Sequence, residues 1–131
     1  MLLEPVKDAA DIGIYAKDIQ KSLDFYQGIL GLKKTQELKG LTGTIHRLEY
    51  GKTDIKLIDP TEPPPIGPIG INKQLGFRYI TFVIKNIKKL CETLEEKGIE
   101  FERPLTETRP GITIAMVRDP DGNVIEFVER S

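Results

Sequence analysis

Residues 11–26 read DIGIYAKDIQKSLDFY, and this stretch decides the fold class. Apolar residues alternate with other residues from Asp11 to Ala16, which is typical of a strand with one buried face. Asp18 predicts the start of a helix, because its carboxylate accepts a hydrogen bond from a free helical N–H. Apolar positions from Ile19 to Leu30 then recur at near-helical spacing, and Gly31 suits the helix end. The stretch therefore predicts a strand followed by a helix.

The chain contains a weak internal repeat. Residues 14–19, IYAKDI, resemble residues 82–87, FVIKNI, and residues 55–58, IKLI, resemble residues 125–128, IEFV. In each half the first segment is a strand running into a helix start, and the second is a closing strand. Repeats of this kind indicate two copies of one structural module.

The other elements complete a βαβββ order in each half. A strand near residues 78–84 and a helix from Asn86 to Gly98 open the second copy. The remaining strands are predicted at residues 33–39, 44–50 and 54–58 and at residues 99–103, 112–118 and 123–128. Residues 119–123, DPDGN, have the composition of a tight turn.

The two halves are separated by a proline-rich segment. Residues 59–70, DPTEPPPIGPIG, contain five prolines, which cannot donate to a strand ladder. We expect one α+β domain over residues 1–131, with module 1 at about 9–59, a linker at 60–75 and module 2 at 76–130. One such module leaves a sheet face uncovered, so two modules, from one chain or from two chains, are expected to pair around a cavity, with the helices outside.

Composition excludes several classes of function. The chain has 131 residues, 19 Lys and Arg against 20 Asp and Glu, and a formal charge of -1, so nucleic acid is not an expected partner. No apolar run approaches the roughly 20 residues that span a bilayer, so no membrane partner is expected. No secretory signal pattern opens the sequence, which predicts a cytoplasmic location. Cys91 is alone and cannot form an internal disulfide.

Two motifs resemble those of the vicinal oxygen chelate superfamily, which includes glyoxalase I, extradiol dioxygenases and bleomycin resistance proteins. Residues 11–26, followed by Leu30-Gly31-Leu32, are similar to its strand, cap and helix pattern. Residues 118–127, RDPDGNVIEF, are similar to its closing hairpin. The resemblance implies two βαβββ modules forming a cupped mixed sheet, and a homodimer. The fold alone does not choose among the functions that it hosts.

The resemblance also implies where a metal would bind. The family takes one ligand, usually histidine, from the first strand of each module and an acid near each module's end. These positions fall on Asp11 and Lys56 in module 1 and on Tyr79 and Glu126 in module 2. Only Glu126 keeps the preferred type, since a protonated lysine and a neutral tyrosine are poor ligands. We expect no cofactor. The alternatives are a hard divalent ion held by Asp11 and Glu126 through oxygens and waters, or His46 reaching in from a neighbouring strand as a ligand.

The lost ligand set favours a metal-independent protein that binds a small organic molecule in the cavity between the modules. Alternation places Asp11 and Tyr15 on the polar face of their strand. Tyr15, Tyr50 and Tyr79 offer flat apolar contact with a polar tip, and His46 is a further cavity-lining candidate. The arginines at 47, 78 and 109 are candidates for binding a carboxylate or phosphate, and Arg109 lies in the best-placed loop.

The alternative function is a glyoxalase-like lyase or isomerase. Glu126 or Asp11 would then act as the general base, and Lys56 or Tyr79 would stabilise the oxyanion. Lys56 paired with one of these carboxylates is the purely structural interpretation. An extradiol dioxygenase requires two histidines and a carboxylate for iron, and the chain has one histidine.

Overall fold

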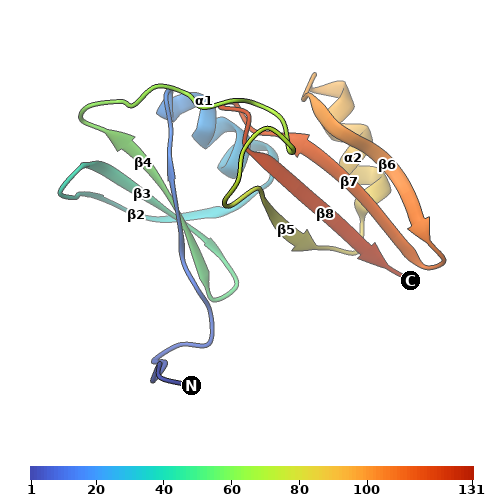
Figure 1. The fold of residues 1–131 in the computed structure, drawn as a ribbon, viewed down its shortest axis with the longest axis horizontal. Helices are drawn as coiled ribbons and strands as arrows, with labels where there is room; N and C mark the ends of the chain where they lie inside the picture. Colours follow the sequence, from blue (N-terminus) through green and yellow to red (C-terminus); the bar gives the residue numbers. More distant parts are fainter. The chain divides into compact units, whose positions relative to one another are not determined.

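The computed structural model describes all residues from 1 to 131 and divides them into two compact units, Met1–Pro65 and Ile66–Ser131. Each unit contains one four-stranded sheet and its own helical segment (Figure 1). None of the helices reaches the length and apolar character that crossing a membrane requires.

Unit 1 has the strand order β1-β4-β3-β2. Strand β1 runs parallel to β4, and the other two pairings are antiparallel. Its elements are β1 (Ile12–Tyr15), α1 (Ile19–Leu23), the π-helix η1 (Asp24–Ile29), β2 (Lys33–Lys39), β3 (Gly43–Tyr50) and β4 (Thr53–Pro60).

Unit 2 has the equivalent order β5-β8-β7-β6, again with one parallel pairing, between β5 and β8. Its elements are β5 (Tyr79–Val83), α2 (Ile87–Glu96), β6 (Phe101–Arg109), β7 (Ile112–Arg118) and β8 (Val124–Arg130). The shared topology confirms the predicted α+β fold of two βαβββ modules.

One face of each sheet is apolar and packs against the helix of its unit. In unit 1, Leu48, Ile55 and Leu57 are buried, together with Phe25 and Tyr26 of η1. The equivalent core of unit 2 contains side chains from three strands and α2: Phe82, Cys91, Leu94, Val117, Ile125 and Phe127. Burying a large apolar side chain contributes about 1.5–3 kcal/mol, so these two cores supply much of the stability.

The first helix differs from the prediction of one continuous α-helix to Leu30. After Leu23 the chain continues as a π-helix from Asp24 to Ile29. The neighbours Phe25 and Tyr26 are both buried, with ring centroids 4.9 Å apart in an edge-to-face arrangement. A π-helical turn changes the helical register locally, and here it accompanies the burial of two consecutive rings.

Unit 2 differs from the prediction in the length of one strand, and its helix has the predicted N-cap residue but a different capping side chain. The strand predicted at residues 99–103 runs from Phe101 to Arg109, with several register shifts against β7. Asn86 stands at the N-cap of α2 but its side chain makes no capping hydrogen bond. The Ile87 N–H instead donates to Glu129 Oε1 at 2.9 Å, so a strand 42 positions away caps the helix.

This cap gives a stability prediction. Glu129→Ala should lower the free energy of unfolding by about 1 kcal/mol, because it removes the acceptor for a free helical N–H. Glu129→Gln keeps an acceptor oxygen and should lose less. Asn86→Ala is the matched control and should change stability by less than about 0.5 kcal/mol. Urea unfolding followed by circular dichroism measures all three, and a larger loss for Asn86→Ala than for Glu129→Ala would contradict the assignment.

Candidate functional site

The helix-free face of unit 1 carries a row of four residues, one from each strand, and three of them have polar side chains. Lys56 of β4 lies between Gly13 of β1 and Arg47 of β3, and Gln36 of β2 follows Arg47. Cross-strand partners project from the same side of a sheet, so Lys56 and Arg47 are neighbours. We call these four residues the cationic row.

The turn between β3 and β4 determines this neighbourhood. Gly51 and Lys52 are the two residues between the strands, and Gly51 has a φ of +58°. A two-residue hairpin turn fixes the register of its strands, which sets Arg47 opposite Lys56. Both residues stand out in the sequence as separate candidates, and counting back from this turn is the signal that predicts their alignment.

A group of ion pairs lies beside the cationic row. Asp11 accepts a 2.6 Å ion pair from Lys7 and a 2.9 Å hydrogen bond from the backbone N–H of Asp54. The hydrogen bond from Lys7 is the main reason that the pKa of Asp11 lies below its ordinary value, and the charge of Lys56 adds to the effect. Lys7, and not Lys56, is therefore the ion-pair partner of Asp11.

An apolar row follows on the other side of the cationic row. It consists of Tyr15, Ile58, Ile45 and Leu38, again one residue from each strand. The three aliphatic residues are half-buried, and the Tyr15 hydroxyl donates to Thr42 Oγ1 at 2.8 Å. Along β3 and β4 the face thus changes from a charged residue to an apolar residue two positions away.

The helix-free face of unit 2 carries Glu126 at the position that Lys56 has in unit 1. Thr81 is its partner on β5 and Met116 its partner on β7. The Thr81 hydroxyl donates to Glu126 Oε1 at 2.7 Å. Tyr79 lies two residues before Thr81 on the same face and is 52% exposed. The structure therefore places Glu126 and Tyr79 on one surface, as alternation predicted.

The other three candidate residues lie apart from these groups within their units. His46 is buried on the helix-facing side of β3, with Leu48, and its Nδ1 is 3.3 Å from Glu37 Oε1. Burial, followed by the charge of Lys34, lowers the pKa of His46.

Tyr50 ends β3 on the same face as His46, next to the turn. Arg109 ends β6 and pairs in register with Ile112 of β7. Ile112 is opposite Arg130 on β8, four residues from Glu126, which is about 13 Å along an extended strand. Arg109 is exposed and belongs to a hairpin end.

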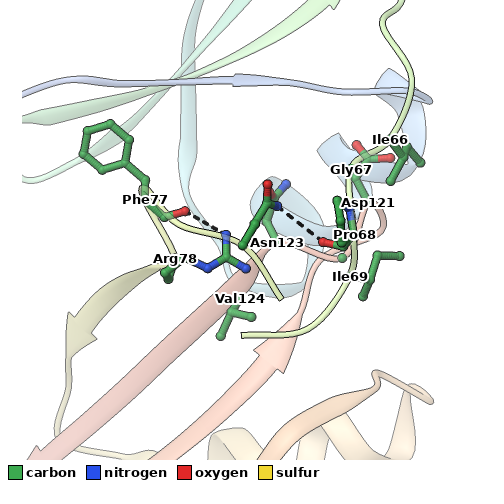
Figure 2. Close-up of a pocket in the computed structure, with 11 residues that line it drawn as sticks. Ile66, Gly67, Pro68, Ile69, Phe77, Arg78, Asp121, Asn123 and Val124 are labelled. Carbon is green, nitrogen blue, oxygen red and sulfur yellow. Dashed lines mark hydrogen bonds between the residues drawn. The ribbon is translucent and has the colours of Figure 1, made fainter. Parts of the chain in front are cut away.

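Sequence analysis missed a small polar pocket within unit 2, between residues 66–78 and the turn at 119–123 (Figure 2). The Arg78 guanidinium donates to three backbone carbonyls, those of Gly70, Ile71 and Phe77, at 2.8–3.1 Å. The pocket has a volume of about 100 Å³, which is well below the roughly 300 Å³ at which organic ligand sites begin. Arg78, a predicted anion ligand, is therefore engaged in holding residues 70–77.

Comparison with known proteins explains the repeated topology. The family model of the Glyoxalase/Bleomycin resistance protein/Dioxygenase superfamily matches residues 9–127. The chain belongs to this superfamily. The membership confirms the resemblance seen in the two sequence motifs.

Individual members of the superfamily are similar over most of the chain. A lactoylglutathione lyase of Escherichia coli O157:H7 is 33% identical over 119 residues, covering 86% of this chain and 84% of that protein. A lactoylglutathione lyase of Schizosaccharomyces pombe is 30% identical over 90% of this chain, which spans only 46% of that relative. The structure of an antibiotic binding protein from Streptomyces sp. CB03234 superposes with a TM-score of 0.73 at 24% identity, covering 100% of this chain and 99% of that one.

The metal that the superfamily implies does not fit the residues present. Unit 1 offers Asp11, already ion-paired to Lys7, and the ammonium group of Lys56, which has no free electron pair while protonated. Unit 2 offers Glu126, bonded to Thr81, and the phenol of Tyr79. Neither unit gathers three or more His, Cys, Asp or Glu side chains into a group that could hold a metal ion. We therefore derive no chemistry through a metal.

The charge of Asp11 gives a pH-dependent prediction. Asp11→Asn keeps an oxygen for the Asp54 N–H but loses the attraction to Lys7, so it should destabilise the protein at neutral pH. Because folding lowers the pKa of Asp11, its stabilising charge is present above the ordinary pKa and is lost as pH falls through the folded-state pKa. Urea midpoints of wild type and variant should therefore converge on acidification.

Glu4→Gln is the control, since Glu4 is exposed and its side chain makes no ion pair. A difference between wild type and Asp11→Asn that stays constant from neutral pH to about pH 3 would contradict the role of the charge.

Proposed function

We propose that this chain is a metal-independent member of its superfamily that binds a small organic molecule on the helix-free faces of its sheets. The single observation behind the proposal is the place of Lys56. It lies in the cationic row at a position where the family resemblance implies a metal ligand, next to the apolar row. Half-buried aliphatic side chains and an exposed tyrosine suit a flat or aliphatic ligand. The fold shared with an antibiotic binding protein is consistent with this function.

The binding residues that we propose lie on these two faces. They are Asp11, Tyr15 and Lys56 in unit 1 and Tyr79 and Glu126 in unit 2. His46 faces the helix of unit 1, and Tyr50 and Arg109 lie at strand ends, so we assign these three no direct contact with the ligand.

A second candidate function is a lyase or isomerase, and two observations favour it. The curated relatives at 30–33% identity are lactoylglutathione lyases. Glu126 keeps a carboxylate oriented by Thr81, as a general base requires. In this version Glu126 removes a proton next to a carbonyl, and Tyr79, on the same face of unit 2, stabilises the resulting oxyanion.

One experiment separates the two functions. The purified chain is assayed for lactoylglutathione formation from the hemithioacetal of methylglyoxal and glutathione, with and without added Ni²⁺ or Zn²⁺. The binding function predicts no turnover above the uncatalysed rate. Turnover that disappears in Glu126→Gln, with an unchanged melting temperature, would establish the lyase instead.

The binding itself is mapped with 2-naphthol as a probe by ¹H–¹⁵N chemical shift changes. We expect shifts confined to residues of the helix-free faces, such as Tyr15, Ile45 and Ile58, with no comparable shifts around Leu94 and Ile125 in the core. Saturation without shifts on the helix-free faces would contradict the proposed site.

A further inference from the structure

Two like charges stand opposite each other in the cationic row. Arg47 and Lys56 are register partners in the antiparallel pairing of β3 and β4, so their Cβ atoms are about 4.5–5.5 Å apart on one face. Like charges directly opposite each other destabilise a sheet. This pair therefore costs stability in the absence of a compensating anion.

The protein's own carboxylates compensate this pair only in part. Lys56 makes no hydrogen bond or ion pair. Arg47 Nη1 forms an ion pair with Asp54 Oδ2 at 3.6 Å, which is too long for a hydrogen bond. The Nε atom of Arg47 is buried and also has no partner.

The nearby carboxylates are shared with a third cation. Lys7 lies 2.6 Å from Asp11 Oδ1 and 3.7 Å from Asp54 Oδ2. Two carboxylates thus face three cations, Lys7, Arg47 and Lys56, which leaves one positive charge. Two further pairs of opposite charge lie near this end of the sheet and cancel. Glu49, which is opposite Asp54 on β4, is the cross-strand partner of Lys33, and Lys52 is 2.8 Å from Asp8.

There is room for an anion at the cationic row. Gly13, the β1 partner of Lys56, contributes no side chain, and a Cβ there would meet nothing closer than Ile58 Cδ1 at 3.7 Å. The Arg47 side chain is 36% exposed, so its terminal nitrogens can be reached. Lysine and arginine together bind carboxylates and phosphates through charge-assisted hydrogen bonds.

The apolar row lies on the same face, two residues further along each strand. Two residues of extended chain span about 7 Å, close to the distance between an anionic group and the middle of a ring system attached to it. Ile58 follows Lys56 on β4, and Ile45 precedes Arg47 on β3. A ligand with an anionic end and an apolar body therefore matches both rows together.

We propose that the helix-free face of unit 1 binds an amphipathic organic anion, with its carboxylate or phosphate on Lys56 and Arg47 and its apolar body on Ile45 and Ile58. This inference rests on the proposed binding function and specifies its ligand class. The anion supplies the negative charge that the like-charged pair lacks.

The test compares three naphthalene probes of nearly the same shape: 2-naphthoate, 2-naphthyl phosphate and the uncharged 2-naphthamide. Their affinities are measured by isothermal titration at low ionic strength, where screening is weak. For the wild-type chain we expect at least about tenfold tighter binding of one or both anions than of the amide, equivalent to about 1.4 kcal/mol. The tighter of the two anions indicates whether a carboxylate or a phosphate is preferred.

The variants are Lys56→Gln, Arg47→Gln and the double variant, with Lys88→Gln on the exposed surface of α2 as the matched control. Each single variant should lose most of the preference for the anions, and the double variant should bind all three probes alike. Removing a like-charged neighbour should leave the urea midpoint of Lys56→Gln equal to or above that of wild type. Lys88→Gln should keep the full preference.

The outcomes separate the inference from the function on which it rests. Equal wild-type affinities for the amide and both anions would overturn the anion site and leave the binding function standing. No binding of any probe would overturn the binding function and the anion site together. An undiminished preference for the anions in the double variant would overturn the assignment to Lys56 and Arg47. A large fall in the urea midpoint of Lys56→Gln would also overturn it, because the charge of Lys56 would then be satisfied within the protein.

Discussion

Each four-stranded sheet buries one apolar face against the helical segment of its own unit, and the rest of the structure depends on this constraint. Side chains alternate between the two faces of a strand, so burying Ile55 and Leu57 in unit 1 forces Lys56 onto the other face. The same rule in unit 2 buries Ile125 and Phe127 and turns Glu126 outward from the core. Core packing thereby fixes the direction of residues that contribute nothing to the core.

The two modules share their topology and differ in charge at equivalent places. The closing strand of one carries a cation at its centre and that of the other carries a carboxylate. A substitution of Lys56 or Glu126 leaves the apolar face that packs on the helix intact, because both side chains lie on the opposite face. Lys56 and Glu126 therefore give the two units different chemistry on the same arrangement of strands.

The sequence was sufficient for the topology and for the faces on which Lys56, Tyr79 and Glu126 lie, since both follow from local periodicity and from the repeat. Contacts between distant residues were not predictable in this way. The cap of α2 comes from Glu129, and the π-helical turn accompanies the packing of Phe25 and Tyr26 on the sheet. Arg47 lies opposite Lys56 because a two-residue turn sets the register between β3 and β4, and the amino-acid composition of the turn alone does not give that register. The homodimer and the identity of the ligand remain predictions.

We propose that an ammonium group at position 56 and a phenol at position 79 stand where the family resemblance implies metal ligands, so that this member binds its ligand through side chains alone. The most direct test is the metal content per chain after incubation with Mn²⁺, Fe²⁺, Ni²⁺ and Zn²⁺ and removal of free metal by desalting. Since neither group is a good ligand in its protonated form, the account predicts near-zero occupancy for all four ions. One tightly held ion per chain would contradict it and would make Asp11 and Glu126 the first residues to examine as ligands.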